Sequence, residues 1–90
     1  MVVRPELYLG GPTGLKIEHN GTHSYFDNST GDIIFRQYTD DKDIIFQSDD
    51  QSGGITTYFT VDGSTGMVKF EDDRRIAIGS GEDTHIYHDG

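Results

Sequence analysis

The chain has 90 residues, of which 32% are hydrophobic and 26% charged, with no cysteine and a formal net charge of −9. Phosphate backbones and anionic lipids repel an acidic surface, so we predict no nucleic-acid partner and no membrane insertion. A chain this short and this poor in apolar residues, with no disulfide or thiolate metal site, buries little surface when it folds alone. We therefore expect the hydrophobic core to be shared between several copies of the chain.

Short segments rich in β-branched and aromatic residues alternate with turn-forming clusters of Gly, Asp, Asn and Ser. This pattern is typical of an all-β protein. The predicted strands are Leu7–Leu9, Leu15–Glu18, Ser24–Phe26, Ile33–Arg36, Ile44–Gln47, Thr56–Val61, Met67–Phe70, Ile76–Ile78 and His85–Tyr87. No window carries apolar residues at helical spacing, so we predict essentially no helix.

The pattern within these segments predicts which faces are covered. Leu15–Glu18 and Val68–Glu71 alternate apolar with polar residues, which places one face on a core and the other in water. The triplets Ile33–Phe35 and Ile44–Phe46 are apolar throughout, each follows an aspartate, and they begin 11 residues apart. We predict that they are buried on both faces and form successive rungs. The residues expected to face the core are Leu7, Leu9, Leu15, Ile17, Ile33, Phe35, Ile44, Phe46, Phe59, Val61, Val68, Phe70, Ile76, Ile78 and Ile86.

A sequence pattern near the beginning of the chain is repeated near its end. Leu7–Gly21 reads LYLGGPTGLKIEHNG, and Ile76–Gly90 reads IAIGSGEDTHIYHDG, aligned without a gap at an offset of 69 residues. We predict a lead-in over residues 1–6, one repeat unit over 7–75, and the start of a second unit over 76–90. Because an isolated repeat rarely buries its own apolar face, the native context is expected to be an array.

Four histidines are the candidate metal ligands: His19, His23, His85 and His88. Within a strand, positions 85 and 88 point to opposite faces, so one chain does not readily hold a metal with both. A threefold axis could gather three copies of His19 or His88 around a metal. The alternative, which we favour, is a partly buried ring that satisfies backbone groups beside its turn. We predict no metal site.

The acidic turns Ser48–Gly54, Asp62–Gly66 and Gly79–Asp83 are candidate calcium loops. None follows the ligand spacing of known calcium-binding repeats, and aspartate that caps backbone amides accounts for them.

Catalysis has little support, because the neighbouring carboxylates lie in turns and no nucleophile elbow is present. These carboxylate pairs are Asp40/Asp41, Asp49/Asp50 and Asp72/Asp73. We predict that the protein is not an enzyme and has no catalytic residues and no cofactor.

The neighbouring aromatics Tyr25-Phe26 and Tyr58-Phe59 place one ring on each face of a strand. An outward tyrosine can stack on a sugar ring, which would make Tyr58 a receptor contact. More often such a ring packs across neighbouring strands, which is the interpretation we favour. Both interpretations remain open from the sequence.

The stretch LKIEHNGTHSYFDNSTGDIIF, the later IIFQSDDQSGGITTYFTVDGSTGMVKF and the returning IAIGSGEDTHIYHDG resemble the repeats of tail-fibre and related structural proteins of tailed, T4-like bacteriophages of marine hosts. The resemblance begins near Leu7 and covers nearly all of the chain. The first copy departs from the pattern, since Glu18 and Asn20 stand where the second has Tyr87 and Asp89. The resemblance implies a trimeric β-structured shaft in the virion tail fibre, extracellular after release.

The sequence thus predicts an all-β, fibrous repeat, an intertwined homotrimeric β-helix or β-prism shaft that spaces and presents a host-attachment tip. Its partners would be two further copies of the chain and the adjacent fibre repeats. A second hypothesis is a module that binds host surface glycans through exposed Tyr and Asp residues of its loops. A third is a monomeric β-solenoid or sandwich.

Overall fold

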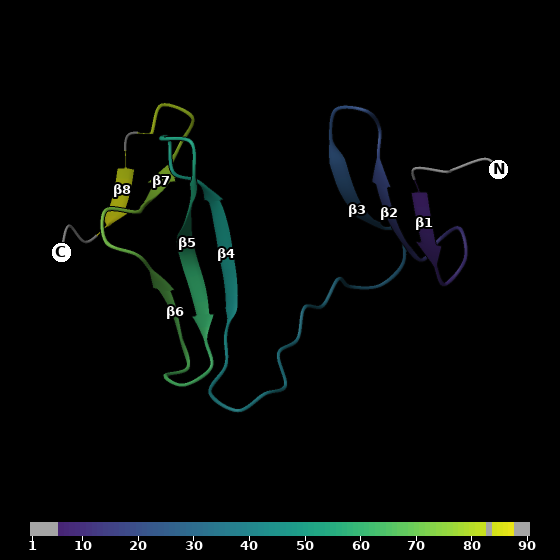
Figure 1. Ribbon diagram of the computed structural model, residues 1–90, viewed down its shortest axis with the longest axis horizontal. Coiled ribbons are helices and arrows are strands. Elements are labelled where there is room, and N and C mark those ends of the chain that lie inside the picture. The colour runs from purple at the N-terminus through teal and green to yellow at the C-terminus, as the bar shows by residue number, and fades with distance from the viewer. Residues whose placement is uncertain (1–5, 83, 88–90) are drawn as a thin grey trace. The chain divides into compact units, whose positions relative to one another are not determined.

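The structure is a computed structural model, and it describes residues 6–82 and 84–87 (Figure 1). The described chain is all-β, with eight strands in three antiparallel sheets and no helix, as predicted. It therefore includes no helix of the length and apolarity needed to cross a membrane. The chain divides into two compact units, Met1–Phe35 and Arg36–Gly90, which are described in turn.

The first unit holds a three-stranded sheet in the order β1-β2-β3. Its strands are β1 (Glu6–Leu9), β2 (Leu15–His19) and β3 (Ser24–Asn28). The turn between β2 and β3 depends on Asn20, whose side-chain oxygen accepts hydrogen bonds from the backbone N–H groups of Thr22 (2.9 Å) and His23 (2.8 Å). This Asx turn adds to the backbone hydrogen bond that the Asn20 N–H donates to the His23 carbonyl (3.0 Å) where the chain reverses.

The second unit begins with another three-stranded sheet, in the order β4-β5-β6. Its strands are β4 (Ile44–Asp49), β5 (Ile55–Asp62) and β6 (Met67–Phe70). A β-bulge shifts the register of β4 and β5 between Phe46 and Gln47. In the connecting turn, the Asp50 carboxylate accepts hydrogen bonds from the N–H groups of Ser52 (2.7 Å) and Gly54 (2.9 Å).

The last two strands form a hairpin of β7 (Arg75–Ile78) and β8 (Thr84–Tyr87). Its register copies that of β1 and β2 at the predicted offset of 69 residues. Leu7 pairs with Ile17 in the first hairpin, and Ile76 pairs with Ile86 in the second. The repeated alternation of apolar residues thus forms the same local structure twice. The predictions for His88 and Asp89 concern residues outside the part of the chain that the structure describes.

The predicted strand Ile33–Arg36 is not a strand in this chain. The segment is extended, but among the described residues its backbone makes no hydrogen bond to any strand. A strand requires a neighbour as well as apolar, β-branched residues, and composition indicates only the residues. The 11-residue rung that paired this segment with β4 is therefore not formed within the chain.

The predicted burial is also wrong for the single chain. Ile33, Ile34 and Phe35 are 51%, 63% and 65% exposed, and Ile45 in β4 is 55% exposed. No hydrophobic side chain is buried anywhere in the described residues. The described part of the single chain therefore has no hydrophobic core, and none of the three sheets closes on itself into a barrel.

Candidate functional site

The first candidate surface is one face of the β4–β6 sheet, which we call the phenylalanine face. The strand registers bring six apolar side chains onto it in two rows: Ile44, Val61 and Val68, then Phe46, Phe59 and Phe70. The ring centroids of Phe46 and Phe59 are 4.6 Å apart at an interplanar angle of 12°, and those of Phe59 and Phe70 are 5.3 Å apart at 29°. Such cross-strand aromatic pairs stabilise the sheet and fix its register.

The phenylalanine face is exposed in the single chain. Phe46 and Phe70 are each 43% exposed, and Val68 is 58% exposed. In the described residues, the buried side chains are instead Thr60 and Asp62, which lie on the opposite face of β5. Two polar side chains of β5 are thus better covered than any apolar side chain of the phenylalanine face, the reverse of what is usual in a soluble monomer.

Asp62 is the most strongly held ionisable group of this sheet. Its carboxylate pairs with the Lys69 ammonium at 2.6 Å and accepts hydrogen bonds from the Ser64 hydroxyl (2.7 Å) and the N–H groups of Ser64 (2.9 Å) and Thr65 (3.3 Å). The Lys69 contact, followed by those of Ser64, holds the pKa of Asp62 well below its ordinary value of 3.8. The same contact raises the pKa of Lys69. The Asp62 carboxylate closes the β5–β6 turn, and its oxygens already accept hydrogen bonds from Lys69, Ser64 and Thr65.

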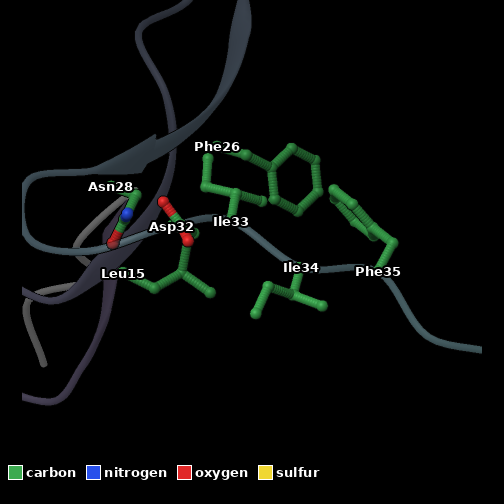
Figure 2. Close-up of a pocket in the computed structure, with 7 residues that line it drawn as sticks. All are labelled: Leu15, Phe26, Asn28, Asp32, Ile33, Ile34 and Phe35. Atoms are coloured by element: carbon green, nitrogen blue, oxygen red, sulfur yellow. The ribbon is translucent and has the colours of Figure 1, made fainter.

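The second candidate surface is the apolar face of the β1–β3 sheet. The registers place Leu7, Ile17 and Phe26 in one row, and Leu9, Leu15 and Asn28 in the next. Beside this face lies a pocket of about 220 Å³ lined by Leu15, Phe26, Asn28, Asp32, Ile33, Ile34 and Phe35 (Figure 2). Figure 2 shows Ile33 and Phe35 pointing to one side of the chain and Ile34 to the other, the alternation of an extended strand.

The opposite face of this sheet is polar and mainly acidic. Lys16 lies 3.3 Å from the carboxylate of Glu18 and 3.8 Å from that of Asp27, and the Tyr8 hydroxyl donates to Glu6 at 2.6 Å. The hydrogen bond to Glu6 raises the pKa of Tyr8, and the contact with Glu18 raises that of Lys16. This face carries three carboxylates and one ammonium group.

The histidines do not assemble a metal site in the described part of the chain, where no group of three or more potential ligands is found. His19 lies at the end of β2, is exposed, and contacts the Ser24 hydroxyl through Nδ1 at 3.1 Å, a side-chain partner where a backbone one was predicted. His23 packs edge-on against Tyr25. His85 contacts Arg75 at 3.2 Å. The His19/His88 metal hypothesis includes a residue outside the description and stays a hypothesis.

The two candidate tyrosines have different surroundings. Tyr25 is 38% exposed on the acidic face. Tyr58 donates its hydroxyl proton to the Asp49 carbonyl at 2.7 Å, and the Arg74 guanidinium lies 4.9 Å from its ring centroid. It lines a polar hollow of about 360 Å³, whose other lining residues include Gln51, Glu82 and His85. Because Arg74 covers one face of the Tyr58 ring, that face is not free to stack on a sugar.

Sequence reasoning missed two of these contacts, Asp62 with Lys69 and Arg74 with Tyr58. The first had a usable signal, since a short turn between β5 and β6 brings an acidic and a basic residue together. Two of the predicted acidic turns contain turns in which Asp50 and Asp62 accept backbone N–H groups, although Ser48 and Asp49 belong to β4. Asp83 of the third predicted turn lies outside the described residues. Comparison with protein-family models, curated proteins and solved structures finds no match to this chain.

Proposed function

We propose that this chain is a structural module that completes its core by assembling with further copies of itself, as a segment of a trimeric β-structured shaft. The observation that carries the proposal is the absence of any buried hydrophobic side chain in the described residues, while one face of each sheet is rich in apolar side chains. Apolar faces of this kind are covered in native proteins, and a second copy offers an equally apolar face.

The resemblance of the sequence to phage tail-fibre repeats gives the module its proposed setting. In that setting, the shaft spaces and presents a host-attachment tip, and adjacent repeats extend it. The same hairpin register at β1–β2 and β7–β8 supports a serial arrangement, because identical hairpins can stack in identical ways. The winding of a β-helix or β-prism belongs to the proposal, as does the location in the virion.

Phe46 and Ile45 allow a matched test, because they are neighbours on β4 and point to opposite faces. Both are exposed in the single chain, at 43% and 55%. Phe46→Asp should dissociate the assembly, since it would place a charge inside the covered face, whereas Ile45→Asp should leave the assembly intact. Light scattering reads the outcome as molar mass. The unsubstituted chain should give three times its 10.0 kDa.

A mass of one chain at dilute concentration would contradict the proposal. Glycan binding is the alternative function, and a glycan array tests it on the same protein. Reproducible binding that disappears in Tyr58→Ala, together with a monomeric mass, would favour the glycan hypothesis over the shaft.

A further inference from the structure

The segment Ile33–Gln37 has the properties of a strand without a partner. Its first three residues are apolar and point alternately to either side of an extended chain (Figure 2). Among the described residues, none of its backbone groups forms a backbone hydrogen bond. The same four letters, Asp-Ile-Ile-Phe, recur at Asp43–Phe46, where Ile44–Phe46 forms the start of β4 and pairs with β5. Of the two places where this sequence occurs, it forms a strand at the one where it pairs with a neighbouring strand.

The turn before this segment has the same sequence pattern as the turn of the β5–β6 hairpin. Asp62-Gly-Ser-Thr-Gly-Met67 joins β5 to β6, and Asp27-Asn-Ser-Thr-Gly-Asp32 follows the same pattern after β3. The closing glycines adopt the same left-handed conformation, with φ of 72° at Gly66 and 76° at Gly31. A turn of the same geometry would place Asp32 opposite Asp27, as Met67 is placed opposite Asp62.

Charge explains why only one of the two hairpins closes. In the β5–β6 hairpin, Asp62 faces an uncharged residue and is neutralised by Lys69 at 2.6 Å. In the other, two carboxylates would face each other, and the position that corresponds to Lys69 is Ile34. Like charges directly opposite each other destabilise a strand pair, so the segment does not fold back on its own β3.

A second copy removes this conflict, because pairing between chains is not bound to the register of the turn. We propose that Ile33–Gln37 of one copy adds antiparallel to the free edge of β3 (Ser24–Asn28) in a second copy, with Phe35 opposite Phe26. This proposal rests on the proposed function, since it names the contact through which the copies assemble. Strand addition of this kind satisfies the backbone groups of both edges.

The apolar and charged side chains favour pairing of β3 with Ile33–Gln37 of another copy, with Phe35 opposite Phe26. Phe35 of the first copy would extend the apolar row of Leu7, Ile17 and Phe26 in the second, just as Phe70 extends the row of Phe46 and Phe59. Arg36 would then stand opposite Tyr25 and diagonal to Asp27, on the face that carries three carboxylates and one ammonium group. Asp32 would lie beyond the end of β3, opposite Ser29, so it would be diagonal to Asp27 rather than directly opposite it as in the fold-back register.

Exposed apolar side chains of this unit are also available for a contact between copies. Six of them are each at least half exposed: Leu7, Leu9, Phe26, Ile33, Ile34 and Phe35. Ile34 points away from Ile33 and Phe35 (Figure 2), and the other five leave exposed apolar surface of the kind that marks an interaction site.

Cysteine pairing tests the proposal directly, because the chain has no cysteine of its own. Ser24 and Gln37 are exposed and face each other in the proposed register. Two chains, one with Ser24→Cys and one with Gln37→Cys, are unfolded together, refolded, oxidised and weighed intact by mass spectrometry. A mixed disulfide in excess of the two homodimers is expected. The control pairs Ser24→Cys with Ile33→Cys, which the antiparallel register holds roughly 13 Å apart, too far for a disulfide.

A second variant restores the pattern of the β5–β6 hairpin. Asp32→Met with Ile34→Lys should let the segment fold back on its own β3 and reduce the mixed disulfide about fivefold or more. Light scattering on the same samples distinguishes failure of strand exchange from failure of self-assembly. A multiple of the chain mass without the mixed disulfide, or with a disulfide in the Ile33→Cys control, would overturn strand exchange and leave the proposed function standing. A single-chain mass would overturn both.

Discussion

Asp62 gives the β5–β6 hairpin an acid-sensitive closure. The carboxylate is held by Lys69 and by donors of Ser64 and Thr65, all of which favour its ionised form. Its pKa in the folded chain is therefore depressed below 3.8, the ordinary value that the unfolded chain retains. A group of this kind stabilises the fold fully above the unfolded pKa and loses that contribution as the pH falls through the folded one.

The free energy of unfolding should therefore fall as the pH is lowered below about 4, with Asp62 contributing to the slope. Denaturant unfolding at several pH values between neutral and strongly acidic measures this slope. Asp62→Asn keeps an acceptor oxygen for the turn but carries no charge, so its slope should be shallower. Asp40→Asn, in the exposed turn at residues 39–41, is the control and should retain the slope of the parent. Identical slopes for Asp62→Asn and the parent would remove Asp62 from this role.

At the scale of elements, the β5–β6 loop is fixed by a close approach between segments. A Cβ atom built on Gly63 would lie 2.1 Å from the backbone carbonyl oxygen of Lys42, while the Gly63 N–H donates to Asp43 at 3.0 Å. The loop therefore lies directly against the residues that lead into β4, which requires glycine for space rather than for an unusual φ.

Gly63→Ala should lower the free energy of unfolding by about 1–3 kcal/mol, the usual cost of forcing an atom into packed structure. Ser52→Ala, in the exposed turn after β4, is the control and should change stability by less than ~0.5 kcal/mol. Because assembly makes melting depend on concentration, both variants are compared with the parent at one protein concentration. Equal melting of Gly63→Ala and the parent would mean that the loop does not lie against Lys42.

The sequence predicts a strand correctly in this chain where a second strand-forming segment follows or precedes it across a short turn. The alternation in Leu7–Leu9 and Leu15–Glu18 places two strands one turn apart, and their repetition at Ile76 and Ile86 reproduces the hairpin. The segment Ile33–Arg36 begins with the same three residues as β4 but has no neighbouring strand to pair with, so propensity alone gives the wrong result there. The bulge after Phe46 was not predictable either, because it arises from the pairing of β4 with β5.

The sequence predicts which residues share the phenylalanine face, but it does not predict that this face is exposed in the single chain. Alternation put Phe46, Phe59 and Phe70 on one predicted face, and the registers confirm that they share it. Their exposure was not foreseen for a single chain, since the same residues were expected inside a core. What covers a face depends on the other chains present, which no local pattern encodes.

At the scale of the whole molecule, net charge opposes the assembly that the apolar faces favour. Each copy carries a formal net charge of −9, so copies repel one another at neutral pH. Apolar contact is insensitive to moderate salt, whereas repulsion between exposed charges is screened within a Debye length of ≈ 10 Å at 0.1 M. An assembly held by apolar faces and strand pairing should therefore tighten as salt is added.

We expect the dissociation constant of the assembly to fall between about 0.01 M and 1 M NaCl, where the Debye length shortens from ≈ 30 Å to 3 Å. Analytical ultracentrifugation over a dilution series measures it. Asp40→Asn with Asp41→Asn removes two of the repelling charges and should make the salt dependence shallower; Asn also tolerates the left-handed backbone of Asp41, whose φ is 62°. An assembly that weakens with salt would instead be held mainly by ion pairs between copies, and the apolar faces would then not be its principal contact.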